Sequence, residues 1–76
     1  MNRIRRKQIA SIIEKLEDLR SEIESVQEEE EEARDNIPES MWETERYEKA
    51  EEACDNLDSA YGAFEELLEY LEAAME

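Results

Sequence analysis

Apolar residues recur through the first half of the chain in alternating steps of three and four. This spacing places side chains on one face of a helix, at positions a and d of a heptad repeat when Ile9 is counted as a. Ile13 widens the stripe at position e. The pattern predicts a first helix over about residues 3–34 that buries one narrow face. The series is Ile9, Ile12, Leu16, Leu19, Ile23, Val26, Glu30, Ala33 and Ile37.

The second half repeats the spacing and predicts a second helix over about residues 41–75. Its series is Tyr47, Ala50, Cys54, Leu57, Tyr61, Phe64, Leu68, Leu71 and Met75. Between the two helices, Pro38 disfavours helical geometry at Ile37 and removes a backbone donor, so a turn is expected over about residues 35–40. Asn36 and Ser40, with capping-box spacing, and Thr44 are three possible N-caps. We expect a helical turn over residues 39–43 that leads into the second helix.

Two apolar seams of equal length, joined by one short turn, predict a single all-α domain over residues 1–76. The fold class is an antiparallel two-helix hairpin with coiled-coil-like packing. The expected register pairs Leu19 with Phe64 and Val26 with Leu57. It also sets the basic first turn beside the acidic last turn, which favours this orientation more than it stabilises the fold.

The second helix carries a further apolar strip that a hairpin partner cannot cover. We call it the alanine-rich strip, and it lies at positions g and c of the repeat. Small side chains permit close helix approach, so we expect two hairpins to associate through this strip into a four-helix bundle, a homodimer. Gly62 either aids that approach or is a tolerated surface glycine. The strip consists of Ala53, Ala60, Ala63, Leu67, Tyr70 and Ala74.

Composition narrows the possible partners. The 76 residues carry a net charge of −15, with 43% charged residues, typical of long helices. Such a charge excludes DNA, RNA and anionic membranes as direct ligands and favours a basic protein surface. The single Cys54 cannot form an internal disulfide, and no signal peptide or membrane-length apolar run is visible. We therefore expect a cytoplasmic protein.

Catalytic and metal-binding signatures are missing from the sequence. There is no His, Cys54 lies on the seam without a base, and there is no glycine-rich phosphate loop. Asp55, Asp58 and Gly62 superficially match a calcium loop, but Leu57 and Ala60 stand where ligand oxygens belong. We expect a non-enzymatic protein with no cofactor and no structural metal.

Five consecutive glutamates, residues 28–32, stand where the helix dipole disfavours them. In the hairpin register, residues 17–32 and 52–67 lie side by side and carry a net −13. That is one charge per about 1.8 Å at about 1.5 Å per residue, close to the one per about 1.7 Å of duplex DNA. The predicted partner-binding residues are Glu24, Glu28, Glu29, Glu31, Glu32, Glu51, Glu52, Asp55 and Asp58. The alternative is a solvated face that serves solubility.

Two single residues each allow more than one interpretation. Glu30, at a core-type position opposite Cys54, is a register device, a functional carboxylate, or a side chain that reaches solvent. Trp42, with Met41 beside it, is either an exposed anchor for a partner or a cap over the core above Ile37.

The segment Asn36-Ile37-Pro38-Glu39 is followed by Glu45-Arg46-Tyr47-Glu48, and then by Ala50, Glu51, Ala53, Asp55, Leu57 and Ala60. This sequence resembles short uncharacterised acidic helical-hairpin proteins of phages, prophages and mobile elements of Gram-positive bacteria. The resemblance implies no particular functional residues. Its mobile-element setting implies a protein that blocks host defence, because acidic DNA mimics recur among anti-restriction and anti-CRISPR proteins.

The leading hypothesis is therefore a non-enzymatic acidic inhibitor that mimics nucleic-acid charge and occupies a basic cleft of a nucleic-acid-binding protein. The alternative is a structural or assembly component that acts through the alanine-rich strip. A third possibility is an accessory subunit of a larger complex.

Overall fold

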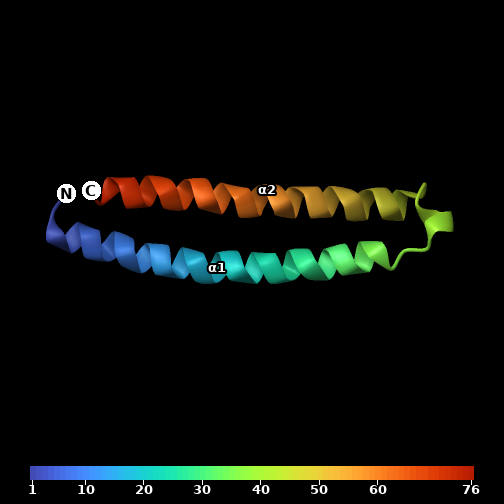
Figure 1. Cartoon of the computed structure of the whole chain (residues 1–76), viewed down its shortest axis with the longest axis horizontal. Helices are drawn as coiled ribbons and strands as arrows, with labels where there is room; N and C mark the ends of the chain where they lie inside the picture. The colour runs from blue at the N-terminus through green and yellow to red at the C-terminus, as the bar shows by residue number, and fades with distance from the viewer.

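The computed structural model describes all 76 residues as two long helices joined by a compact turn (Figure 1). Helix α1 spans Arg3–Asp35, the short 3₁₀ helix η1 spans Glu39–Met41, and α2 spans Glu45–Ala74. The two long helices run antiparallel, and both termini lie at the same end of the rod. The Cα atoms extend over 59 × 15 × 12 Å. The predicted helical hairpin is thus confirmed.

Side-chain caps fix where the helices begin. The Asn2 side chain accepts a hydrogen bond from the Arg5 amide at 2.8 Å, and the Thr44 hydroxyl accepts one from the Tyr47 amide at 3.4 Å. Of the three N-cap candidates, Thr44 begins α2, Asn36 ends α1, and Ser40 lies inside η1.

The second helix begins four residues later than residue 41, where we expected it. The expected helical turn over residues 39–43 is shorter too, a 3₁₀ turn that ends at Met41. An extended backbone at Thr44 separates this turn from α2. The extended geometry frees the Thr44 hydroxyl to cap the new helix, which a continuous helix would prevent.

The seam of α2 forms as predicted, with every member of its series buried or half-buried. The seam of α1 does not, because only its a positions face α2. Its d positions, Ile12, Leu19, Val26 and Ala33, are exposed. Their place is taken by the e positions Ile13, Arg20, Gln27 and Arg34, which are buried or half-buried.

The expectation of an a/d seam on α1 was therefore wrong. The a/e stripe has the same period, so α1 is turned about its own axis by roughly half of the 100° step between residues. The turn brings Ile13 into the core at 9% exposure. It also lets the long side chains of Arg20 and Gln27 contact α2, because their methylene stems pack while their polar ends bond.

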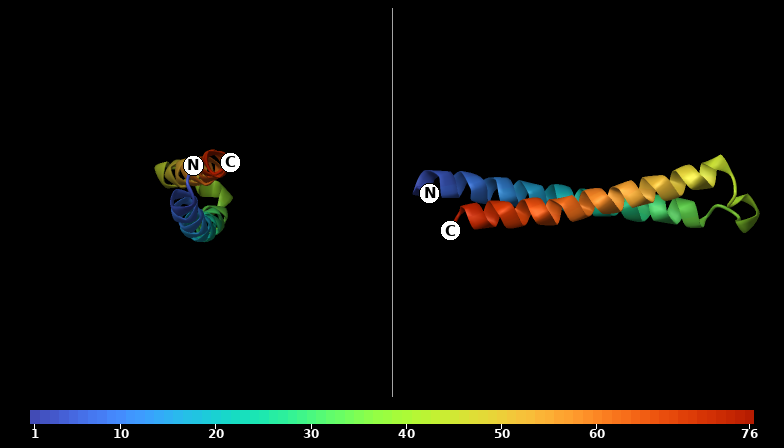
Figure 2. Two further views of the ribbon diagram at one scale, coloured as in Figure 1. Left: turned by 90° about the vertical axis from the view of Figure 1, so that its left-hand side faces the viewer. Right: turned by 90° about the horizontal axis from the view of Figure 1, so that it is seen from above.

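Cross-helix contacts place the register close to the expected one. Gln27 donates to the Asp58 carboxylate at 3.3 Å, and the Arg20 guanidinium lies 5.2 Å from the centre of the Tyr61 ring. Each pair lies within a few residues of the predicted register, in which Val26 faces Leu57. Figure 2 shows the two helices crossing when viewed along the hairpin edge, so they wind about each other as in a coiled coil.

The core of the hairpin is thin. Only four residues are buried: Ile13, Ile37, Cys54 and Leu68. Two helices expose most of their circumference, so each contributes one stripe of contacts. Neither helix has a stretch apolar enough to cross a lipid bilayer.

Candidate functional site

The acids predicted to bind a partner do not all lie on one side of the rod. The Gln27–Asp58 hydrogen bond marks the side where the e positions of both helices meet. By helix periodicity, six of the predicted acids share that side, and we call them the acidic face. All are exposed except Glu31, which is half-buried. The acidic face consists of Glu24, Glu28, Glu31, Glu51, Asp55 and Asp58.

The other three predicted acids point elsewhere. Glu32 and Glu52 project from the outer edges of the two helices, and Glu29 turns toward the side opposite the acidic face. All three are exposed. The pentaglutamate therefore surrounds α1 instead of forming a stripe, since five consecutive helical residues cover more than a full turn.

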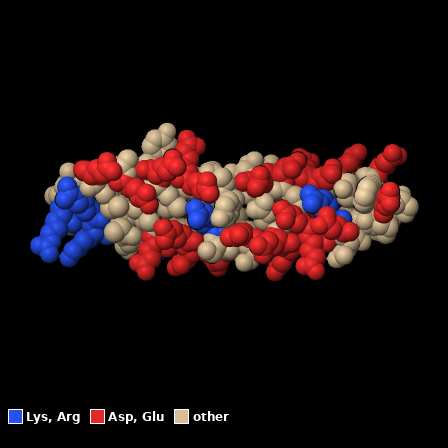
Figure 3. Space-filling model, viewed as in Figure 1, with Lys and Arg blue, Asp and Glu red and all other residues tan.

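Figure 3 shows acids along both helices, with Lys and Arg gathered at the end that holds the termini and in smaller patches farther along the rod. The carboxylates thus form a long negative surface that a few basic groups interrupt. Such a surface raises the local potential toward a positively charged partner and speeds encounter with it.

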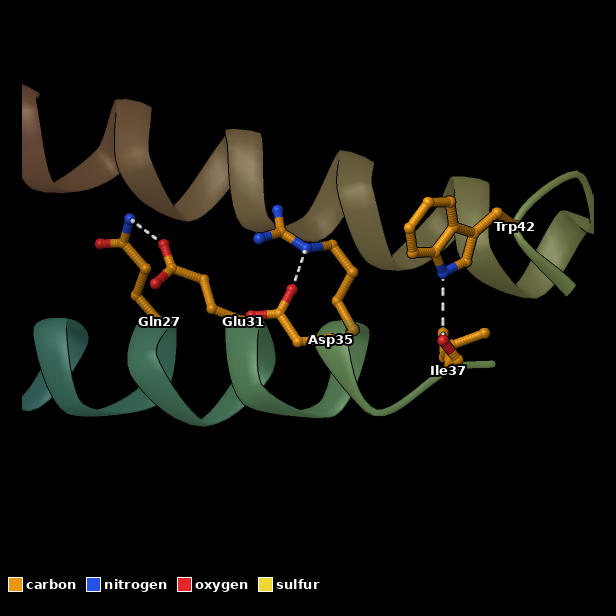
Figure 4. A network of polar contacts seen from close by, with 6 residues as sticks. Gln27, Glu31, Asp35, Ile37 and Trp42 are labelled. Atoms are coloured by element: carbon orange, nitrogen blue, oxygen red, sulfur yellow. Dashed lines mark hydrogen bonds and ion pairs between the residues drawn. The ribbon is translucent and has the colours of Figure 1, made fainter. Parts of the chain in front are cut away.

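Polar contacts order part of this surface. Gln27 donates to Glu31 at 3.4 Å (Figure 4). It also donates to Asp58 and so links the two helices across the acidic face. Arg34 pairs with Asp35 at 3.3 Å, and this hydrogen bond raises the pKa of the guanidinium. Arg34 therefore remains a fixed positive charge inside an acidic surrounding.

Glu30 is half-buried and lies beside Cys54, as the register predicted. It borders a depression of about 300 Å³ near the turn. Three basic residues line the same depression. The Glu30 carboxylate, at a core-type position of the seam, therefore has positive charges near it. The remaining lining residues are Ala33, Arg34, Ile37, Arg46, Lys49 and Ala50.

Trp42 has both a structural contact and an exposed surface. Its indole N–H donates to the Ile37 carbonyl at 3.1 Å (Figure 4). Its ring stacks on Tyr47 with centroids 5.6 Å apart. It is still 46% exposed. The cap over Ile37 is thus formed, and the outer part of the ring is free to contact a partner.

The alanine-rich strip is partly open to solvent. Ala53 and Ala60 are half-buried, whereas Ala63 and Ala74 are exposed. Leu67 is 43% exposed and Tyr70 is 69% exposed. Gly62 lies outside the strip, and a Cβ added there would meet no atom within 4 Å.

Sequence periodicity missed the polar residues that enter the seam, Arg20, Gln27 and Arg34. It also missed the exposure of Ile12, Leu19 and Val26. The sequence did contain a signal for these positions. Each follows an a position by four residues and therefore lies on the same face of the helix: Ile13, Arg20, Gln27 and Arg34. No group of three or more His, Cys, Asp or Glu side chains is arranged to hold a metal ion.

The fold and its surface define an all-α helical hairpin with an acidic face, an exposed apolar strip and a half-exposed tryptophan at the turn. No protein-family model, curated protein or solved structure matches the chain.

Proposed function

We propose that the protein is a non-enzymatic interaction protein that presents its acidic face to a basic, nucleic-acid-binding surface of another protein. The observation that carries the proposal is the convergence of carboxylates from both helices on one side of a narrow rod 59 Å long. A partner cleft that accommodates a nucleic-acid backbone would meet comparable charge spacing here.

The energetics favour such a partner. A basic cleft and an acidic rod each hold counterions, and their release on contact supplies affinity that falls as salt rises. Trp42 adds an aromatic side chain at the turn end, where it would anchor the contact. The resemblance to proteins of phages and mobile elements supports a host-defence nuclease or its regulator as the partner, with the hairpin as its inhibitor.

Binding to an isolated basic partner, first captured from host lysate, tests the proposal. Between about 50 and about 200 mM salt, affinity should fall by about three orders of magnitude for six contacted charges. Neutralising the acidic face to amides should weaken binding strongly and reduce this salt dependence. A matched control neutralises the acids outside this face, Glu29, Glu32 and Glu52, which should matter less. Affinity that is unchanged by salt would contradict the proposal.

The second candidate is a structural or assembly component that self-associates through the alanine-rich strip into a four-helix bundle. The exposure of Leu67 and Tyr70 favours it, because large apolar side chains in water are used at interfaces. Under this candidate, Leu67→Glu abolishes association, whereas neutralising the acidic face leaves association intact.

A further inference from the structure

Three large aliphatic side chains of α1 lie in solvent at regular intervals. Ile12 is 45% exposed, Leu19 is 48% exposed and Val26 is 51% exposed. They occupy successive d positions of the heptad repeat, seven residues apart, and so form one straight row along the helix. The hairpin leaves this row without a partner although it belongs to the apolar pattern of the sequence.

This row and the alanine-rich strip lie on the same side of the hairpin. In an antiparallel pair, the e positions of both helices meet on one side and the g positions meet on the other. The Gln27–Asp58 hydrogen bond joins two e positions and identifies the first side. The d positions of α1 and the g and c positions of α2 therefore lie together on the second side. We call this combined surface the apolar face.

The apolar face has an unusual charge pattern for this chain. Of 76 residues 24 are acidic, yet none of the nine g and c positions of α2 is acidic. These positions are Arg46, Lys49, Ala53, Asn56, Ala60, Ala63, Leu67, Tyr70 and Ala74. The apolar face occupies part of a broad side of the rod whose Cα atoms extend over 59 × 15 Å, so a second hairpin packed on this side would bury an area of the order of the roughly 800 Å² per partner of a standard stable interface.

We infer that a second copy of this chain covers the apolar face in an antiparallel, two-fold-symmetric dimer, with α1 antiparallel to the partner's α1. The turn of each copy then lies beside the termini of the other, and we call this arrangement head-to-tail. Charge selects this orientation. The half of the rod near the turn, residues 20–63, carries −12, whereas residues 1–19 and 64–76 together carry −3. In a dimer with both turns at the same end, the two halves that each carry a charge of −12 would lie against each other. Head-to-tail packing sets each −12 half against a −3 half.

The face supplies specific contacts in that orientation. Leu19 lies near the middle of α1, so a two-fold axis there brings Ile12 of one copy to Val26 of the other. The same axis places Lys15 next to the opposing Glu22. This pair brings unlike charges to the rim of the apolar contact. The acidic face remains outward on each copy.

This inference deepens the proposed self-association, on which it rests, but not the proposed binding by the acidic face. The sequence predicted contact between two copies through the second helix alone, whereas the structure adds the d positions of α1 as half of the surface. Failure of the two proposals is distinguishable, because one is read from mass and cross-links and the other from affinity for a basic partner.

Oligomer mass tests the surface. The 9.0 kDa chain should sediment as a dimer, and Leu19→Asp should convert it to a monomer. Ser21→Asp is the matched control, because it adds the same charge at an exposed position away from the apolar face and should leave the dimer intact. A wild-type monomer at all micromolar concentrations, or a dimer that Leu19→Asp leaves unchanged, would overturn the inference.

Cross-linking tests the orientation in chains that keep all but one apolar contact. In a Cys54→Ala background, Leu19→Cys should form a disulfide dimer on its own. Ile12→Cys mixed with Val26→Cys should cross-link to each other in preference to themselves, because head-to-tail packing pairs these two positions. Preferential self-linking of Ile12→Cys would instead overturn the head-to-tail arrangement.

Discussion

Cys54 is the most enclosed side chain of the hairpin, at 4% exposure. Burial raises the pKa of its thiol, because the thiolate would lose hydration. The Glu30 and Glu31 carboxylates raise this pKa further, while Arg34 acts in the opposite direction. The folded state therefore favours the protonated thiol more than the unfolded state does.

This preference predicts a loss of stability in alkaline solution. Because the folded pKa lies above the unfolded value of about 9, the contribution of the thiol is fully present below about pH 9 and is lost as the pH rises through the folded pKa. The difference in unfolding free energy between the wild type and Cys54→Ala should therefore shrink above pH 9. Urea unfolding across this pH range measures it, and a difference that stays constant would contradict the prediction.

The burial of three polar side chains in the seam could not be predicted from their residue types alone. These residues are Arg20, Gln27 and Arg34. Each is polar, so a hydrophobic pattern assigns it to the solvent side, yet each is half-buried in the seam. Their stems cover apolar surface while their ends find partners: Tyr61 for Arg20, Asp58 for Gln27 and Asp35 for Arg34. The partners of Arg20 and Gln27 lie on α2, so they become visible only when the two helices are placed together.

At the level of elements, the hairpin, the bounds of α1 and the register of the two helices were predictable, whereas the late start of α2 at Glu45 was not. The strong heptad period fixes helix type, and Pro38 fixes the break. The rotation of α1 was not predictable, since the a/d and a/e stripes share one period and differ in which side chains fit against α2. The acidic face was predictable only in part for the same reason, because rotation decides which acids share a side.

The acids of the two helices should affect stability in opposite directions. Glu28 and Glu32 form a like-charged pair, one turn apart, in the last turns of α1, whereas Glu45 and Glu48 lie in the first turn of α2. Acids are unfavourable at a helix C-terminus and favourable at an N-terminus. Glu28→Gln with Glu32→Gln should raise the unfolding free energy by about 0.5–1 kcal/mol.

The matched pair Glu45→Gln with Glu48→Gln should instead lower the unfolding free energy, in part because it removes the Glu45–Lys49 contact at 3.1 Å. Thermal unfolding followed by circular dichroism at moderate salt compares the two variants. Equal stabilisation by both would show that relief of the overall charge, and not the helix dipole, governs these positions.

At the scale of the whole molecule, the hairpin has two different broad sides. One carries the acidic face and is ordered by the Gln27 hydrogen bonds, and the other carries the apolar face. A protein with this division can associate with itself on one side while its charge remains available on the other. The head-to-tail dimer would then display two acidic faces, and a partner with two basic sites would bind with increased avidity.

The thin core also predicts that folding depends on protein concentration. With four of 76 residues buried, a lone hairpin is marginally stable, and a dimer interface would supply the missing apolar burial. A hundredfold rise in concentration then favours the folded dimer by about 2.7 kcal/mol and raises the melting temperature. Leu19→Asp should melt at a lower temperature that does not change with concentration. A wild-type melting temperature that is equally insensitive to concentration would show that the hairpin folds without a second copy.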